Sequence, residues 1–251
     1  MMNQDKVLSV NNDNLKVTED WHNTNYAVEG FAAQRLYPNE ELLRFFGRNF
    51  FHMDRELRKS ISVLEVGCGT CSNLWMMARE GFDTYGIDLS AEAIKLGEQM
   101  LAHWDTSANL SVASMTQLPY EDAKFDVVCD VLSSTCLDYI NFKILLAEIS
   151  RVLKVGGKFF TYTPSINSDA FTNFAPAEKI DEFTLNGIYR EDSPFYGNFS
   201  PFRFADPSLL SEQLRDYGLR VERLELVTKT YNNMKENFQF VSLEAVKERE
   251  I

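Results

Sequence analysis

Apolar runs with the length of strands alternate with amphipathic, helix-like segments along the middle of this 251-residue chain. A strand that is followed by a helix and then by another strand returns to the same sheet in a parallel direction. The connecting helices then cover both faces of the sheet. The alternation therefore predicts an α/β fold of the Rossmann-like, doubly wound kind, with a mostly parallel sheet and helices on both faces. The predicted strands are residues 61–66, 84–88, 109–113, 125–132 and 158–163.

The C-terminal segment predicts the elements that close the sheet. Asp206 and Pro207 supply a capping side chain and a proline for the first helical position, and this helix is expected to end near Gly218. Strands at 219–229 and 237–246 follow, separated by a short polar turn. A connection of this length joins antiparallel neighbours, so these two strands predict a closing hairpin.

Two further regions of the chain lie outside this alternation of strands and helices. Residues 1–18 are polar and lack apolar periodicity, so we expect them to be frayed or loosely docked. Residues 164–205 carry too many aromatic side chains for an idle loop, and they predict a lid. We expect residues 1–58 to form a tail and helical cap, and 59–251 a domain that contains this aromatic lid insertion. A cap helix is predicted from the helical spacing of Leu42, Leu43, Phe46 and Phe50.

Charge and hydropathy restrict the partners. The formal net charge of −12 and the scattered lysines and arginines argue against nucleic acid as a partner. No apolar run reaches the roughly 18 to 20 residues that a bilayer span needs, and the polar start lacks the pattern of a secretion signal. We therefore expect a cytoplasmic protein without a membrane partner, as a monomer or a homodimer. The four cysteines, with a single pair at Cys68 and Cys71, predict reduced thiols and no metal site, a redox pair being the alternative.

Two glycines and one aspartate indicate a nucleoside site. Gly67 and Gly69 stand where the first strand turns into its helix, so the backbone can approach a ligand closely. A tight turn without a ligand is the simpler reading of this pair. Asp88 ends the second strand about twenty residues further on, where a carboxylate can accept both hydroxyls of a ribose. Its alternative role is to cap the following helix.

Four segments, in order and at normal spacing, resemble the signature segments of the class I S-adenosylmethionine-dependent methyltransferases. They read LEVGCGT at 64–70, YGIDLS at 85–90, LPYEDAKFDVV at 118–128 and EISRVLKVGGKFF at 148–160. None of them is specific alone, but together they carry the resemblance. It implies a seven-stranded sheet whose last strand is antiparallel, S-adenosyl-L-methionine as the cofactor and S-adenosyl-L-homocysteine as the product, with no metal.

The resemblance also implies roles for single residues. Residues that would border the methionine part of the cofactor are Glu65, Gly67 and Gly69, with main chain at Asp130 to Leu132 meeting its amino group. Asp88 would hold the ribose, Leu89 would lie against the adenine face, and Ser114 and Met115 would meet the adenine edge. The chain departs from the family pattern at two places, because Cys71 replaces the third glycine of the loop and Ser114 replaces an acid.

The acceptor site is predicted less sharply. An amine or hydroxyl that receives a methyl group must lose a proton, so a base near the methyl is expected. Asp130, just after the fourth strand, is the first candidate, with local hydrogen bonding as its alternative role. Tyr26 is the second candidate, and His22 beside it could contact the substrate. In the insertion, residues expected to bind a ring with an anionic group are Tyr189, Arg190, Tyr196 and Arg203.

These features together predict methyl transfer to an oxygen or nitrogen atom of a small molecule, such as a sugar, a phosphorylated metabolite or a secondary metabolite. The tetrapeptide of amino-directed nucleic-acid methyltransferases and the Pro-Cys dipeptide of cytosine chemistry are absent from the sequence. One alternative is a non-catalytic cofactor-binding or partner protein on the same scaffold. A lesser one is an NAD-dependent oxidoreductase, which Ser72 at the third glycine position disfavours.

Overall fold

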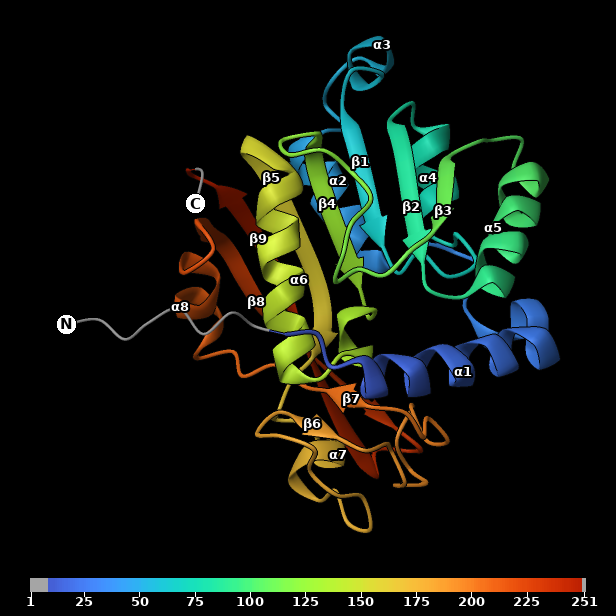
Figure 1. The fold of residues 1–251 in the computed structure, drawn as a ribbon, viewed down its shortest axis with the longest axis vertical. Coiled ribbons are helices and arrows are strands. Elements are labelled where there is room, and N and C mark those ends of the chain that lie inside the picture. Colours follow the sequence, from blue (N-terminus) through green and yellow to red (C-terminus); the bar gives the residue numbers. More distant parts are fainter. Residues whose placement is uncertain (1–8, 250–251) are drawn as a thin grey trace.

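The computed structural model describes residues 9–249, and a seven-stranded sheet runs through its centre (Figure 1). The strand order is β3-β2-β1-β4-β5-β9-β8. All neighbours from β3 to β5 pair in parallel, whereas β9 pairs antiparallel with both β5 and β8. The predicted fold class is confirmed, including the antiparallel last strand. The strands are β1 Ser62–Val66, β2 Asp83–Asp88, β3 Asn109–Val112, β4 Phe125–Val131, β5 Leu153–Pro164, β8 Leu219–Tyr231 and β9 Glu236–Lys247.

Helices cover the two faces, and further helices lie at the carboxyl ends of the parallel strands. The α-helices are α1 Asn12–Glu29, α2 Glu40–Asn49, α3 Arg55–Arg58, α4 Leu74–Arg79, α5 Ala91–His103, α6 Tyr139–Val152, α7 Asp169–Thr172 and α8 Leu210–Arg215. Two short 3₁₀ turns are η1 Gly30–Ala33 and η2 Ser134–Cys136. In Figure 1, α6 lies in front of the sheet and α2 behind it, while α1 crosses the lower ends of the strands. The insertion adds a two-stranded ribbon, β6 Thr184–Leu185 with β7 Phe202–Arg203.

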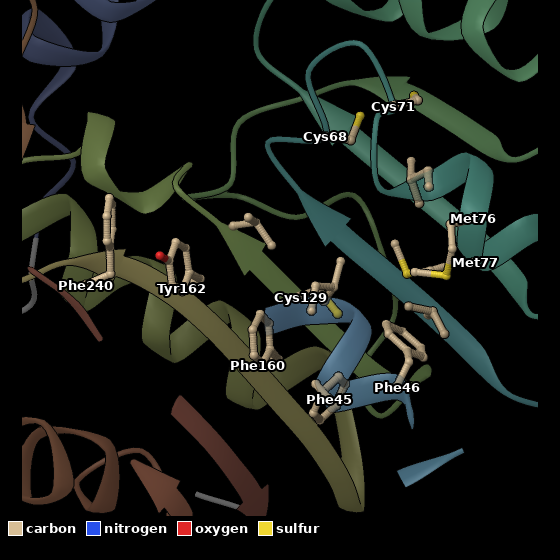
Figure 2. Packing of buried hydrophobic residues seen from close by; sticks show 14 of the residues in the cluster. Phe45, Phe46, Cys68, Cys71, Met76, Met77, Cys129, Phe160, Tyr162 and Phe240 are labelled. Carbon is tan, nitrogen blue, oxygen red and sulfur yellow. The ribbon is translucent and has the colours of Figure 1, made fainter. Parts of the chain in front are cut away.

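The period of two along each strand divides the core into two layers. Val63 points to the layer under α2, α4 and α5, whereas Leu64 points to the layer under α6 and α8. Figure 2 shows the first layer, where Phe45 of α2 packs towards Phe160 of β5 and Phe46 lies on the side of Met76 and Met77. Because both faces are buried, the strands are apolar on both sides, which explains their continuous apolar runs.

Capping side chains fix where two of the surrounding helices begin. The Ser90 hydroxyl accepts a hydrogen bond from the Ala93 N–H at 3.2 Å, directly after the end of β2. Asp138 accepts one from the Asn141 N–H at 2.8 Å at the start of α6. Each cap satisfies a backbone donor that would otherwise be lost at the helix end. Both helices therefore start at the carboxyl edge of the sheet, close to the site described below.

The structure corrects three expectations. The frayed tail predicted for residues 1–18 is wrong from residue 12 onwards, because these residues belong to α1, while residues 1–8 lie outside the described part. On α2, Leu43 is 36% exposed and Phe45, not singled out above, is fully buried. The helix predicted to start at Asp206 begins only at Leu210, because Asp206 instead accepts from Ser208 in a preceding turn.

The two neighbouring α2 positions provide a test of the core. Phe45→Ala should lower the free energy of unfolding by about 3 to 5 kcal/mol, because a fully buried ring leaves a cavity. Leu43→Ala is the matched control and should cost less than about 1 kcal/mol, because its side chain is already partly in water. Urea denaturation measures both changes. Equal losses for the two variants would contradict the assigned burial.

Candidate functional site

A cavity of about 320 Å³ lies at the carboxyl ends of β1, β2 and β4, underneath α1. Its wall comes from segments that are far apart in the sequence: α1, the loop after β1, the end of β2, the turn after β3, the turn after β4 and the insertion. The edge where carboxyl ends of parallel strands meet is where sheets of this kind bind ligands. The predicted nucleoside site therefore lies at a cavity, whereas Asp130 and the four residues predicted in the insertion are not part of its lining.

The loop after β1 requires its two glycines. Gly67 has φ +65°, and a Cβ added there would lie 2.3 Å from the Cβ of Ser133. The Ser133 hydroxyl donates to the Gly67 carbonyl at 2.9 Å, so this loop and the turn after β4 are joined. Gly69 has φ +51°, and an added Cβ would collide with the Gln34 side chain. Both positions therefore favour glycine for conformation, and Gly67 also needs it for space, whereas the end of the flexible Gln34 side chain could move away from position 69.

Asp88 holds that loop while facing the cavity. Its Oδ2 accepts from the Gly69 N–H at 2.8 Å, and its Oδ1 accepts from the Ser90 N–H at 2.9 Å. Burial raises the pKa of this carboxyl, although the backbone donors partly oppose the shift. Ser90 caps α5 and Asp88 only holds the N–H of that cap residue, so the alternative role expected for Asp88 belongs to Ser90. Each carboxylate oxygen of Asp88 has a second lone pair, so Asp88 can hold the loop and still accept hydroxyl groups from a ligand.

Glu65 is the least satisfied acid in the cavity wall. Its side chain is 1% exposed, its Oε1 accepts from the Asn73 amide at 2.5 Å, and its Oε2 has no hydrogen-bond partner among the described residues. Burial raises the pKa of Glu65 to about 8. The guanidinium of Arg35, which also lines the cavity, interacts with this carboxyl and lowers its pKa. A buried, unpaired acceptor in a cavity indicates a missing donor, and an ammonium group would provide one.

The remaining residues predicted to contact the cofactor lie mostly on the same wall. Leu89, Ser114, Met115 and Leu132 all line the cavity. The Ser114 hydroxyl is also engaged locally, because it lies 2.7 Å from the hydroxyl of Thr116. Gly69 is not itself part of the lining but holds Asp88 through its N–H. These assignments as cofactor contacts stay predictions.

Asp130 lies beneath the cavity wall and is not part of it. Its side chain is 1% exposed and accepts from the N–H groups of Ser133 and Ser134, from the Ser134 hydroxyl and from the Thr161 hydroxyl at 2.8 Å. Arg203 balances its charge from the insertion side. With its oxygens engaged in this way, Asp130 fits the alternative of local hydrogen bonding and not the role of a base.

Helix α1 covers the cavity and is attached mainly by polar groups. At its start, the Asn11 and Asn14 amides donate to Asp138 Oδ2 at 2.8 and 2.6 Å. Further along, Thr18 donates to the Cys136 carbonyl at 3.1 Å. Near its middle, the Ser90 hydroxyl donates to the Asn23 side-chain oxygen at 2.6 Å. The helix is thus fixed to the N-terminal ends of both α5 and α6.

His22 and Tyr26 project from α1 into the cavity. His22 Nε2 lies 3.3 Å from the Cys136 sulfur, and burial lowers the pKa of His22 to about 4. The imidazole is therefore neutral near pH 7. Tyr26 is 4% exposed, its hydroxyl accepts from Gln34, and burial together with the charge of Asp88 raises its pKa well above the usual value.

The insertion contributes to the wall with other residues than those predicted. Phe195, Asn198 and Phe202 line the cavity. The four residues predicted to bind substrate, which are Tyr189, Arg190, Tyr196 and Arg203, are absent from this lining.

Each of the two arginines has a structural partner. Arg190 forms an ion pair with the buried Glu236 at 2.5 Å. Arg203 is 2% exposed, donates to the Ser134 hydroxyl at 3.0 Å and stacks on the Phe142 ring at 3.6 Å. The expected pocket for an anionic ring is therefore not formed by these side chains.

Sequence reasoning missed the segment between η1 and α2. Gln34 and Arg35 reach the cavity, and the Gln34 side chain accepts from the Thr70 N–H at 3.3 Å. No motif surrounds these two residues, and their position depends on the path of the chain after α1. Within residues 9–249, no group of three or more His, Cys, Asp or Glu side chains is placed to hold a metal ion, and no helix has the length and apolar character to cross a bilayer.

Comparisons with known proteins agree with this geometry. Residues 64–161 match the family described as "Methyltransferase domain". A sterol 4-C-methyltransferase of Caenorhabditis elegans is 32% identical over 110 residues, which are 43% of this chain and 32% of the relative. A phthiotriol/phenolphthiotriol dimycocerosates methyltransferase of Mycobacterium ulcerans is 32% identical over 148 residues, 58% of this chain and 48% of the relative. The matches thus span about a third and about half of these two relatives.

A solved structure shares the fold over nearly the whole chain. It is the 1,6-didemethyltoxoflavin-N1-methyltransferase of Burkholderia thailandensis, with bound 1,6-didemethyltoxoflavin and S-adenosylhomocysteine. The TM-score is 0.66 at 14% identity, covering 98% of this chain and 94% of that one. At this identity the likeness concerns the fold alone.

The environment of His22 predicts how stability depends on pH. Because the folded pKa of about 4 lies below the ordinary 6.5, the folded state resists protonation. The stability linked to His22 is present above pH 6.5 and is lost as the pH falls towards 4. Urea denaturation at pH 7.5 and 4.5 should show a loss about 2 to 3 kcal/mol larger in the wild type than in His22→Gln.

His103→Gln is the control for removing a histidine as such, because His103 lies at the end of α5 and does not line the cavity. It should retain the acid loss of the wild type. If His22→Gln and His103→Gln behave alike, the placement of the His22 ring between α1 and the cavity wall is refuted.

Proposed function

We propose that this chain, which belongs to the class I S-adenosylmethionine-dependent methyltransferases, transfers a methyl group from that cofactor to an oxygen or nitrogen atom of an uncharged, largely apolar small molecule. The observation that carries the proposal is the unpaired Oε2 of Glu65 in a cavity that also contains Asp88 and the glycine loop. S-adenosylmethionine has an ammonium, a ribose and a sulfonium, and these three groups match the donors and acceptors of the wall.

The residues fit this cofactor one by one. Glu65 would accept from the ammonium, and Arg35 beside it would pair with the carboxylate of the same amino acid. Asp88 would accept the ribose hydroxyls with the lone pairs that Gly69 and Ser90 leave free. Leu89 and Met115 offer an apolar surface for the adenine ring. Ser114 would accept from the adenine amino group.

The bound cofactor supplies an electrophilic methyl group on a sulfonium. The task of the protein is then to hold the acceptor atom close to that methyl, in line with the bond that breaks, and to keep water away. We assign both parts to α1 and the insertion, because residues of both segments line the cavity.

The acceptor half of the cavity favours an apolar molecule. Side chains there include Trp21, Leu137, Phe195 and Phe202. Of the described residues that line the cavity, Arg35 carries the positive charge, and it interacts with Glu65. This wall supports an uncharged acceptor over the phosphorylated or nucleotide-linked sugar considered above. The names of the two relatives, which refer to sterols and to phthiotriol dimycocerosates, agree with an apolar acceptor.

His22 is our candidate for the group that receives the proton of the acceptor. Glu65 and Asp88 are assigned to the cofactor, and Asp130 lies outside the wall. His22 is neutral near pH 7 and one of its ring nitrogens can accept a hydrogen bond. With a pKa of about 4 it is a weak base, so it suits a proton transfer that accompanies methyl transfer and does not precede it. Tyr26, as a neutral phenol, would orient the acceptor.

Cofactor binding should release a proton from Glu65. At pH 7 most Glu65 side chains are protonated in the free protein, because their pKa is about 8, and a neighbouring ammonium favours the carboxylate. Calorimetry of S-adenosylmethionine binding in phosphate and in Tris should reveal release of just under one proton per cofactor. Glu65→Gln should abolish the release and weaken binding roughly 10- to 100-fold.

Glu98→Gln, on the exposed side of α5, is the matched control and should bind with the affinity and proton release of the wild type. Unchanged proton release in Glu65→Gln would mean that the ammonium does not meet Glu65.

Asp88 provides the second test. Asp88→Asn should weaken binding of S-adenosylmethionine roughly 10- to 100-fold, because the amide loses the charge and one acceptor. Asp83→Asn, at the exposed start of the same strand, should have no effect. NAD titrated in parallel should not bind. Binding of NAD alone would favour the oxidoreductase, and binding of neither would favour a non-catalytic protein on this scaffold.

A further inference from the structure

One ring nitrogen of His22 meets a thiol in the cavity wall. His22 Nε2 lies 3.3 Å from the Cys136 sulfur, and both residues line the cavity. One helical turn earlier on α1, the Thr18 hydroxyl donates to the Cys136 carbonyl at 3.1 Å, so two residues on the same helix face contact Cys136. The rings of Trp21 and Tyr26 flank the imidazole, with centroids 4.8 and 6.0 Å away. The imidazole is therefore held against the sulfur.

The other ring nitrogen of His22 has no such contact. No hydrogen bond joins Nδ1 to any of residues 9–249. A neutral imidazole has a single N–H group, and the hydrogen bond made by one nitrogen decides which of the two tautomers is present. The direction of the contact with Cys136 therefore determines whether Nδ1 is a donor or an acceptor.

The proton of the thiol has a second partner in Thr135. The Thr135 hydroxyl oxygen lies 3.9 Å from the Cys136 sulfur. Its own proton is already used, because this hydroxyl donates to the Leu132 carbonyl at 2.8 Å. A hydroxyl has one proton, so its oxygen can only accept from the thiol. Cys136 keeps its proton near pH 7, because burial raises the pKa of the thiol to about 12.

These contacts form a relay with one consistent direction. The Leu132 carbonyl receives the hydroxyl proton of Thr135, Thr135 receives the thiol proton, and the sulfur lone pairs are left for an N–H of His22. In the opposite arrangement the thiol would donate to His22, and the oxygen of the buried Thr135 would lose this donor. Because buried polar atoms are rarely left without partners, the first arrangement is favoured.

We propose that Cys136 and Thr135 are positioning residues that hold His22 in the tautomer with its proton on Nε2. This inference rests on the proposed function, in which His22 receives the proton of the methyl acceptor, and it adds that Nδ1 is the nitrogen that receives it. The proton moves from the acceptor atom to Nδ1 while a lone pair of that atom bonds to the methyl carbon. The resulting imidazolium keeps its Nε2–H bond to the sulfur, so the relay is the same before and after the transfer.

The test is nitrogen-15 NMR of the imidazole rings of the full chain at pH 7.5, where His22 is neutral because burial lowers its pKa to about 4. An unprotonated ring nitrogen resonates far downfield of a protonated one, so the spectrum reports the tautomer. The chain has three histidines, and His22→Gln identifies the signals of His22. The wild type should show a protonated Nε2 and an unprotonated Nδ1. A protonated Nδ1 overturns the inference.

Two variants test the two links of the relay. Cys136→Ala removes the sulfur, and Thr135→Val removes the acceptor of the thiol proton, which is then free to turn to Nε2. Each should shift the tautomer ratio about fivefold towards Nδ1–H, the usual effect of one net hydrogen bond. Cys136→Ser should preserve the wild-type tautomer, because a hydroxyl can accept from Nε2 and donate to Thr135. An unchanged ratio in Cys136→Ala or Thr135→Val means that the residue only fills space, and it overturns the inference.

Cys129→Ala and Thr163→Val are the matched controls, because both side chains are buried and neither lines the cavity. Both should show the wild-type ratio, and a control that shifts it as much as Thr135→Val refutes the relay. If thermal melting shows that Cys136→Ala is unfolded, Thr135→Val decides. The spectra need neither cofactor nor acceptor. A failure of S-adenosylmethionine to bind in calorimetry would therefore refute the proposed function, whereas the spectra decide the tautomer separately.

Discussion

Three carboxyl groups at one edge of the sheet, two buried and one half-buried, determine how the site is built. Asp130 is surrounded by serine and threonine donors and has Arg203 nearby, and Asp88 accepts two backbone N–H groups. Glu65 receives one amide and keeps an unpaired oxygen. The number of hydrogen bonds that each carboxyl group accepts thus decreases from Asp130, which lies beneath the cavity, to Glu65 in its wall. Since an unpaired buried carboxylate is unfavourable, Glu65 stays largely protonated near pH 7, and a cation bound beside it would favour the ionised form.

Helix α1 and the insertion, which both contribute to the cavity wall, are attached to the rest of the domain by different interactions. Of the 18 residues of α1, Thr18 and Tyr26 are the buried ones, and the helix is attached mostly through hydrogen bonds. The insertion instead packs through a chain of rings, among them Phe195, Phe202 and Phe238. Elements with few buried apolar contacts open at lower free energy. Helix α1 is therefore the cover that opens more easily for ligands.

The sheet could be predicted from the sequence because its signals are local. Each apolar run, the glycine loop and Asp88 can be recognised from a few neighbouring residues. The glycine loop and Asp88 also define the part of the site that is proposed to bind the cofactor. The first part of α1 was predicted as frayed because its support is distant, as in the hydrogen bond from Asn11 to Asp138, 127 residues away. The cavity-lining residues of the insertion were predicted incorrectly because its aromatic side chains are buried or exposed in no regular sequence order. Arg203 looked like a ligand because sequence does not reveal its partners Ser134 and Phe142.

The attachment of the insertion at Arg203 has an evolutionary consequence. This guanidinium contacts η2 and Phe142 of α6, whereas the neighbouring Phe202 lines the cavity. The other cavity-lining residues of α1 and the insertion lie outside the sheet and do not include Glu65 or Asp88. Natural selection can therefore change the preferred acceptor at less cost in stability through half-buried residues such as Trp21 and Asn198 than through the buried Phe202. A mutation at Arg203 lacks this freedom, because it would disturb both halves of the site at once.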